Sequence, residues 1–273
     1  MLTVLIPCKN EARQIEACIA SARLLGGEIL VADSGSIDGT LDIVAGMPDC
    51  RLIQRPFTTY ADFKNWAIPQ AGYPWVFVLD ADERITPELA GEVRRTLAGN
   101  PNHIHAYRIK RRTFFLGYEA RFGPWLNDGP HRLFLRDKCR YGKCRVHEEL
   151  VVDKQRRGRL RNKLLHYTAN TYDEFFAKYV NYTRYGAADR WDQGERTSLV
   201  NMLLCPIFRF LWLYFARGGF LDGAIGVHTC MLQAFFVTFF KRARLWELEH
   251  GHTVPDDAVA HVLPFTAPTR RAA

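Results

Sequence analysis

Several features that mark whole classes of proteins are absent from this chain of 273 residues. Its seven cysteines form no C-x-x-C pair, and the spacing of Cys139 and Cys144 matches no usual zinc-ligand pattern. Isolated buried thiols in a reducing compartment are therefore expected. Residues 2–6 form too short an apolar core for a signal peptide, so we expect a strand there and a cytoplasmic protein. No sequence repeat or low-complexity tract is present, and 48% apolar residues suffice for a sizeable core.

A glycine-rich phosphate loop is also absent after the first predicted strand. The residues that follow it are Pro7-Cys8-Lys9-Asn10-Glu11, none of which is glycine. A nucleotidyltransferase, which would use a sheet and a bound metal ion, should carry such a loop after its first strand. This class of enzyme is therefore disfavoured. The chain also lacks an uninterrupted apolar run of the about 18–20 residues that a membrane-spanning helix needs, because Arg209 and Arg217 interrupt the first candidate.

What the sequence does contain is an alternation of strands and helices over its first hundred residues. Short apolar runs predict strands at residues 2–6, 28–32, 51–54 and 75–79. Between them lie helical patterns that we expect Asn10 and Ser36 to cap. This order predicts an α/β fold with a mostly parallel sheet and helices on both faces. Ligands of such sheets bind beyond the carboxyl ends of the strands.

Acidic residues follow three of these predicted strands. Asp80 and Asp82 come directly after the run at 75–79, and strand alternation would point both carboxylates to the same side. Glu11, Asp33 and Asp38 follow the first two strands and should reach the same edge. Carboxylate oxygens are hard ligands that suit Mg²⁺ or Mn²⁺ shared with a substrate diphosphate. We therefore predict a cation and diphosphate site at this edge.

Three linked motifs resemble the nucleotide-sugar half of family 2 glycosyltransferases. They span Leu5 to Glu11, Asp33 to Thr40, and Asp80 to Asp82, over roughly the first 100 residues. In the second half, the segments Trp125 to Phe134 and Val146 to Glu149 are similar to bacterial lipopolysaccharide-core glycosyltransferases that attach β-1,4-glucose to core heptose. The resemblance implies a Rossmann-like sheet of the GT-A type. It also implies transfer of a sugar from a nucleotide-sugar to a glycolipid or saccharide acceptor.

The resemblance also assigns candidate site residues. Asp80, Asp82 and His147 are the candidate metal ligands, and the residues expected to bind the donor are Pro7, Glu11, Asp33, Ser34, Gly35, Asp38, Lys64, Asn65 and Asp80. UDP-hexose is the expected donor, because Asp33 is placed to accept a hydrogen bond from a ring N–H. An inverting transfer needs a base for the acceptor hydroxyl, and both Asp128 and Glu148 are candidates. The family has Glu-Asp where this chain has Asn127-Asp128, so both candidates stay open.

Charge is distributed unevenly along the chain. Residues 1–100 hold 9 Lys and Arg against 13 Asp and Glu, whereas residues 101–168 hold 17 against 6. The basic block can be a solvated face, or it can contact anionic lipid or a phosphorylated glycolipid acceptor. Nucleic acid is disfavoured, because no recognised nucleic-acid-binding module accompanies the charge.

The C-terminal part is predicted to be helical and associated with a membrane. Aromatic residues mixed with Arg and Lys between Leu199 and Trp246 favour helices in the membrane interface, while core helices and spanning helices remain alternatives. We expect a nucleotide-sugar half (1–100), an acceptor half (101–168), a helical extension (169–250) and a loose tail (251–273). The whole would act on the inner face of the cell membrane. A non-catalytic, membrane-associated nucleotide-binding protein is the alternative, although the intact carboxylates argue against it.

Overall fold

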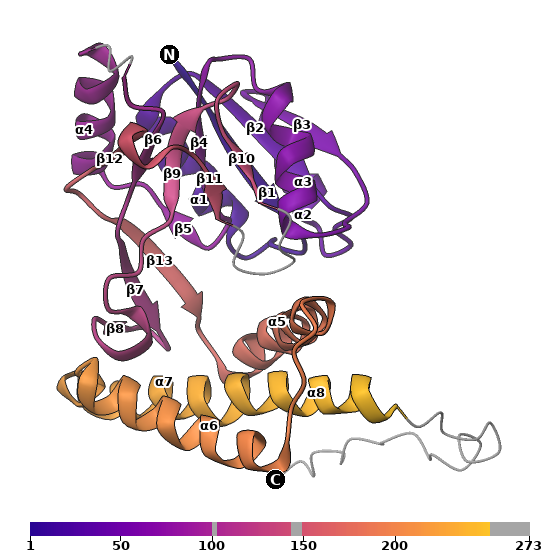
Figure 1. Cartoon of the computed structure of the whole chain (residues 1–273). Helices are drawn as coiled ribbons and strands as arrows, with labels where there is room; N and C mark the ends of the chain where they lie inside the picture. Colours follow the sequence, from indigo (N-terminus) through magenta and orange to yellow (C-terminus); the bar gives the residue numbers. More distant parts are fainter. Residues whose placement is uncertain (100–102, 143–148, 252–273) are drawn as a thin grey trace, which may run out of the picture.

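The chain forms a sheet domain and a layer of long helices beside it (Figure 1). The computed structural model describes residues 1–99, 103–142 and 149–251. His147 and Glu148 lie outside the described residues, as does the tail from residue 252 onward. Residues 101–168 complete the same sheet that residues 1–100 begin. The four predicted segments stay a prediction.

A seven-stranded sheet forms the centre, in the order β12-β6-β9-β4-β1-β2-β3. Strands β4, β1, β2 and β3 are parallel, and β9 runs antiparallel between β4 and β6. The four predicted strands are all present, as β1 (Leu2–Cys8), β2 (Glu28–Asp33), β3 (Cys50–Gln54) and β4 (Trp75–Val78). The sheet is completed by β9 (His131–Leu135), β6 (Ala106–Arg108) and, at the edge, β12 (Arg157–Arg159). The central residues of β1, β2 and β4 are almost all apolar because helices bury both faces of these strands.

Helices cover the two faces of this sheet (Figure 1). Alternate residues of β1 divide between two cores, so that Ile6 packs in the cluster of Ile19 from α1 (Ile15–Ala22), whereas Leu5 packs in that of Phe63 from α3 (Tyr60–Ala67). Helix α4 (Pro87–Ala98) joins the first cluster, and α2 (Thr40–Ala45) lies beside α1. Thr86 caps α4 by accepting a hydrogen bond from the Leu89 amide.

Two predicted helix caps are wrong. Helix α1 begins only at Ile15, and α2 begins at Thr40 after Gly39, whose φ is 87°. Asn10 and Ser36 instead cross-link the loops after β1 and β2. The Asn10 amide donates to Ser36 Oγ (2.8 Å), and Asn10 Oδ1 accepts from the Ile37 amide (2.8 Å). Partners 26 and 27 residues away thus replace the local capping bond.

A second sheet, in the order β5-β13-β7-β8, connects the sheet domain to the helices. It comprises β5 (Glu83–Arg84), β13 (Leu164–Ala169), β7 (Arg111–Phe115) and β8 (Tyr118–Ala120), while β10 (Arg140–Tyr141) and β11 (Leu150–Val151) form a separate pair. The predicted helical extension (169–250) therefore begins with α5 (Tyr172–Asp192), which Thr171 caps. Tyr167 belongs to β13, where its ring stacks on Phe114.

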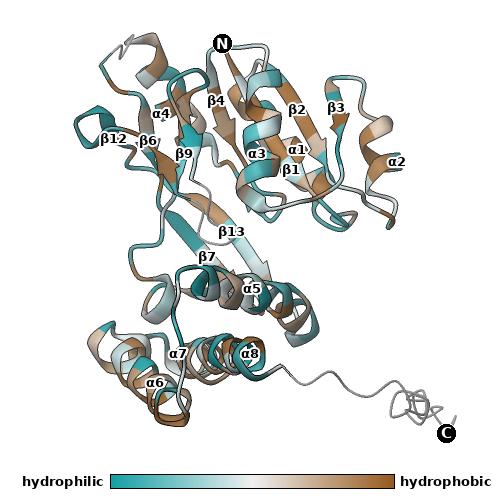
Figure 2. Ribbon diagram, turned by 45° about the vertical axis from the view of Figure 1, so that its right-hand side comes forward, coloured by the Kyte–Doolittle hydropathy of each residue, from teal (hydrophilic) through white to brown (hydrophobic). Residues whose placement is uncertain are grey.

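The helical layer lies below the sheet domain in Figure 1, with α5 between the domain and the remaining helices. Helix α6 (Leu199–Leu211) continues as a π-helix to Ala216, and α7 (Gly223–Met231) continues through residues 232–238 into α8 (Phe239–His250). Figure 2 shows apolar residues along α6, on the far side of the molecule from the sheet domain.

Two helical stretches are long and apolar enough to cross a membrane, judged by length and composition alone. Residues 199–216 have a mean hydropathy of 1.7 with 11% of the stretch buried, and residues 219–250 reach 1.5 with 28% buried. The expectation that neither run is long enough to span is corrected here, since the first helix continues through Arg209. The Arg209 guanidinium lies 4.9 Å from the Trp212 ring centroid, which helps to accommodate its charge.

Candidate active site

A buried carboxylate shapes the loop after β2. Asp33 ends β2 and is fully buried, and it accepts hydrogen bonds from the Gly35 amide (2.9 Å), the Ser36 amide (3.0 Å) and the Ser36 hydroxyl. Burial alone would raise the pKa of Asp33, but the bonds from Ser36 and Gly35 outweigh it and lower the pKa. Gly35 has a φ of 100°, which a residue with a side chain adopts only with strain.

Asp38 performs a similar role from the other side of this loop. Its carboxylate accepts from the Thr40 amide (3.1 Å) and, across the loops, from the Ala12 amide (3.0 Å). Thr40 Oγ1 in turn accepts from the Glu11 amide (2.8 Å). These bonds outweigh the effect of burial and lower the pKa of Asp38. The predicted donor loop is therefore built in advance, while the contacts of its residues with a nucleoside stay a prediction.

Three other predicted donor residues lie at or near this edge. Pro7 belongs to β1, and the Ser34 amide and hydroxyl both donate to the Cys8 carbonyl (3.0 and 3.2 Å). Asn65 is occupied elsewhere, because its side-chain amide exchanges two hydrogen bonds of 2.9 Å with the backbone of Tyr141. Asn65 thus fixes β10 against α3.

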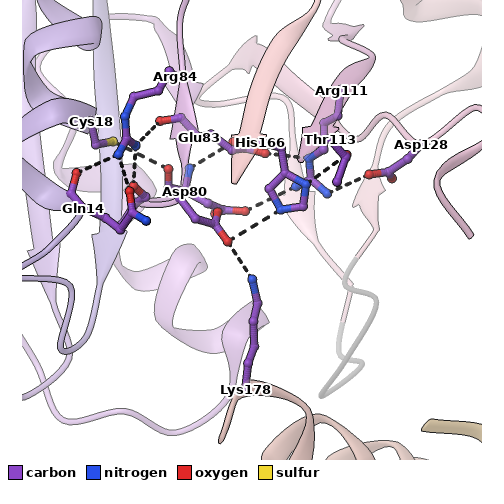
Figure 3. A network of polar contacts seen from close by, with 12 residues as sticks. Gln14, Cys18, Asp80, Glu83, Arg84, Arg111, Thr113, Asp128, His166 and Lys178 are labelled. Carbon is purple, nitrogen blue, oxygen red and sulfur yellow. Dashed lines mark hydrogen bonds and ion pairs between the residues drawn. The ribbon is translucent and has the colours of Figure 1, made fainter. Parts of the chain in front are cut away.

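Asp80 follows β4 and is surrounded by three cationic side chains. Its Oδ1 lies 3.5 Å from Lys64 Nζ, and its Oδ2 pairs with Arg132. Oδ2 also lies 3.5 Å from Arg111 Nη2 (Figure 3). Burial works against ionisation of Asp80, but the charges of Arg132, Lys64 and Arg111 hold its pKa well below the ordinary value. Asp80 is therefore an anion whose position is fixed from both the sheet and α3.

Asp82 contacts a different set of groups. Its Oδ2 lies 2.6 Å from Lys178 Nζ of α5 and 3.6 Å from His166 Nε2 of β13. On the other edge of the ring, His166 Nδ1 shares a hydrogen bond of 3.2 Å with the Thr113 hydroxyl. Burial opposes ionisation of Asp82, but Lys178 and His166 hold its pKa well below the ordinary value. Strand alternation does not set the directions of the two acids, since β4 ends at Val78.

Glu11 completes the acidic side of the site. Burial, together with the negative charges of Asp82 and Asp80, outweighs the attraction of Lys178 and raises the pKa of Glu11 to about 7. Burial is the largest cause of this shift, and a bound cation would offset the smaller contribution of the two neighbouring carboxylates. Within the described residues, no three His, Cys, Asp or Glu side chains are close enough to hold a metal ion unaided. Asp80 and Asp82 nevertheless fit Mg²⁺ or Mn²⁺, which commonly take one or two carboxylates and complete their shell with phosphate and water.

A buried ion network behind Asp80 was missed by sequence reasoning. Glu83 is fully buried, and its Oε1 lies 2.6 Å from Arg111 Nε and 2.7 Å from Arg132 Nη2. Its Oε2 accepts from the Asp80 amide (3.1 Å). Arg111 belongs to the basic block of residues 101–168, but its mostly buried side chain is engaged in ion pairs with acids. The one sequence signal for this network was the position of Glu83 directly after Asp82.

Asp128, one of the two candidate bases, shares Arg111 with Asp80. Its Oδ2 lies 3.1 Å from Arg111 Nη1, and Figure 3 shows it at the end of this polar network. Asp80 and Asp128 both line a hollow of about 290 Å³, whose walls also include Lys64, Arg111, Gly129, Pro130, Arg132, Tyr141 and Glu149. The site therefore places a potential base in the same hollow as the fixed carboxylate of Asp80. The other candidate base, Glu148, and the candidate metal ligand His147 lie outside the described residues.

This arrangement defines an α/β protein with an acidic site at the carboxyl edge of its sheet. Residues 3–150 match the model of the glycosyl transferase family 2. The lipopolysaccharide core biosynthesis glycosyltransferase LpsC of Rhizobium meliloti (strain 1021) is 31% identical over 95% of this chain and 98% of that protein. An uncharacterized glycosyltransferase of Rickettsia bellii (strain RML369-C) is 27% identical over 90% of this chain and 86% of that protein. A solved structure of S. aureus TarS residues 1–349 with UDP covers 92% of each chain, with a TM-score of 0.49 and 13% identity.

The chain belongs to glycosyl transferase family 2. The predicted family is confirmed, and so is the predicted α/β fold class of the GT-A type with a helical C-terminal extension. The protein is therefore a glycosyltransferase, with a nucleotide-sugar as the donor that this family uses.

Proposed function

We propose that this protein is a metal-dependent, inverting glycosyltransferase that moves a hexose from a UDP-sugar to a hydroxyl of a glycolipid or lipopolysaccharide-core saccharide. The observation that carries the proposal is the shared hollow in which the fixed carboxylate of Asp80 and the candidate base Asp128 face each other through Arg111. The printed name of LpsC supports the class of acceptor. A non-catalytic nucleotide-binding protein would have no use for a base at this position.

On the donor side, the chain supplies a prearranged acidic edge. Asp80 and Asp82 would hold Mg²⁺ or Mn²⁺, which supplies positive charge to stabilise the leaving diphosphate. Lys64, Arg111 and Arg132 keep Asp80 ionised and in place, so little reorganisation is required during transfer. The loops bound together by Asp33 and Asp38 form the neighbouring wall on which the nucleoside would lie.

On the acceptor side, Asp128 would take the proton from the attacking hydroxyl. Arg111 holds Oδ2, while Oδ1 makes no hydrogen bond or ion pair to another described residue and is free to accept the proton. Inversion requires the hydroxyl to attack the face of the sugar opposite the leaving diphosphate, so base and metal site must lie on opposite sides of the sugar. Glu148 stays the second candidate base.

We further propose that the enzyme is peripheral on the cytoplasmic face of the membrane. A core helix would be mostly buried, but only 11% of residues 199–216 is buried, which argues against the core alternative. Leu203, Phe208 and Phe215 are 66%, 64% and 60% exposed. Large apolar side chains exposed together on one helix are typical of a surface that enters lipid.

The direct test is transfer from a panel of nucleotide-sugars, with and without Mn²⁺, to deacylated lipopolysaccharide-core oligosaccharide. We expect UDP-hexose to be the preferred donor, with a product of inverted anomeric configuration and loss of activity on chelation. Binding of UDP without hydrolysis or transfer of any UDP-sugar would favour the non-catalytic alternative. Full activity in the presence of chelator would refute metal dependence.

A further inference from the structure

A second and larger hollow, of about 490 Å³, opens beside the first and is lined by basic side chains. Among the described residues, its charged lining comprises Arg108, Lys154, Arg157 and Arg159, with Glu149 as the one acid and His131 as a further basic group. The two hollows share Gly129, Pro130, Tyr141 and Glu149. None of the acidic residues at the donor edge lines the second hollow. It therefore continues the site beyond Asp128, on the side away from the predicted diphosphate position.

The basic side chains are placed together by the central sheet itself. In the register of three adjacent strands, Arg159 of β12 pairs with Arg108 of β6, and Arg108 pairs with His131 of β9. Arg157 lies two residues from Arg159 and so projects from the same face of β12. Figure 1 shows these three strands side by side at one edge of the sheet. Like charges on directly paired positions destabilise a sheet, so this row costs stability unless an anion compensates it.

Within the described part of the chain, no acid makes an ion pair with any of the four charged basic side chains, which are Arg108, Lys154, Arg157 and Arg159. Arg108 donates to the carbonyls of Gly129 (2.5 Å) and Asn127 (2.6 Å), and Arg157 donates to the Val152 carbonyl (3.2 and 2.8 Å). These bonds fix the two guanidinium groups without neutralising them.

The positive charge of these side chains affects the pKa of His131. Burial lowers the pKa of His131, the charges of Arg157 and Arg108 lower it further, and Glu149 only partly opposes them. The hollow is thus a region of positive potential with prearranged guanidinium donors, which is the usual environment of a bound phosphate.

We propose that this second hollow binds a phosphate monoester carried by the acceptor, close to the hydroxyl that receives the sugar. The proposal rests on the proposed function, because Asp128 in the adjoining hollow defines where that hydroxyl lies. A phosphate dianion offers several acceptor oxygens to the converging guanidinium and ammonium groups, whereas a neutral sugar would leave them uncompensated. The donor diphosphate is a poorer occupant, since its predicted site is at Asp80 and Asp82.

The test uses glucose 6-phosphate as the probe, with glucose and inorganic phosphate in parallel, and follows the His131 Cε1–H resonance by NMR. We expect glucose 6-phosphate and phosphate to raise the pKa of His131 and glucose to leave it unchanged. The double variant Lys154→Gln with Arg159→Gln should bind both anions about tenfold more weakly or worse. These two side chains make no hydrogen bond to another described residue, so the variant should remain folded. Lys138→Gln with Lys163→Gln makes the same change in net charge outside the hollow and should bind as the wild type does.

Calorimetry of UDP with Mn²⁺ on the same samples separates this proposal from the proposed function. If UDP binds but neither anion moves the His131 resonance, the phosphate subsite is refuted and the donor site stands. If the double variant binds the anions as tightly as the wild type, the subsite is likewise refuted. If vesicles containing phosphatidic acid shift the resonance while glucose 6-phosphate does not, the phosphate belongs to a lipid headgroup and the assignment to the acceptor is overturned. If the anions bind as expected but UDP does not, the subsite stands and the proposed donor site fails.

Discussion

Lys178 allows a direct test of the contact between the helical layer and the donor site. This residue belongs to α5 and reaches into the polar network of Figure 3, where its Nζ lies 2.6 Å from Asp82 Oδ2, a residue that the figure does not label. Any divalent ion on Asp82 therefore meets an ammonium group already in place. The side chain of Lys178 is 45% exposed, so it can move towards solvent when a cation binds, whereas Asp82 is only 17% exposed. Replacing Lys178 by Met keeps most of the apolar length of the side chain and removes the charge.

Two opposite effects are expected from Lys178→Met. Without metal, Asp82 loses a partner, and a pair of this intermediate exposure should contribute about 1–2 kcal/mol, well below the 3–5 kcal/mol of a fully buried pair. With metal, the variant avoids repulsion between the ion and an ammonium group held nearby. At about 8 Å and an effective dielectric constant of about 40, that repulsion is about 2 kcal/mol. Mn²⁺ should therefore bind about 10–30-fold more tightly to the variant.

Titration calorimetry of Mn²⁺, with and without UDP, together with thermal unfolding, measures both effects. We expect Lys178→Met to unfold about 2–6 °C lower without metal and to regain this difference when Mn²⁺ is saturating. Lys163→Met removes an exposed lysine elsewhere and serves as the control. A folded variant with unchanged or weaker Mn²⁺ affinity would refute the competition between Lys178 and the ion. Loss of UDP affinity without any change in Mn²⁺ affinity would instead make Lys178 a ligand of the diphosphate.

The strands of the donor half could be predicted because each carries its own signal. Strands β1, β2 and β4 are buried on both faces, so their central residues are almost all apolar and can be recognised without knowledge of their partners. Given a parallel sheet, the acids that follow these strands must meet at one edge, and Asp33, Asp80 and Asp82 do so. The sheet topology thus brings acids that are separate in the sequence together at one site.

The residues that organise the site could not be found in this way, because their partners are distant in sequence. Arg132 and Glu83 are 49 residues apart, and Lys178 and Asp82 are 96 apart. A charged residue in a sequence predicts an exposed side chain, because a charged side chain is buried only where an oppositely charged partner compensates it. Asn10 and Ser36 failed as caps for the same reason, since each bonds across the loops.

Three further predictions address acidity, the base and the membrane. With a folded pKa of about 7 against an ordinary 4.5, Glu11 should make metal-free protein lose up to about 3 kcal/mol of stability as the pH rises from about 4.5 to 7, and urea unfolding of Glu11→Gln should lack this slope. Asp128→Asn should lower kcat about 10²-fold or more while UDP binds normally in calorimetry; retained activity would move the role to Glu148. Replacing Leu203, Phe208 and Phe215 by Ser should weaken sedimentation with anionic vesicles about 10²-fold or more, because each large side chain that enters lipid contributes about 1.5–3 kcal/mol. Because these side chains are exposed, the helix content of the variant by circular dichroism should stay unchanged. A variant that unfolds, or one that sediments with vesicles as strongly as the wild type does, would contradict the peripheral placement.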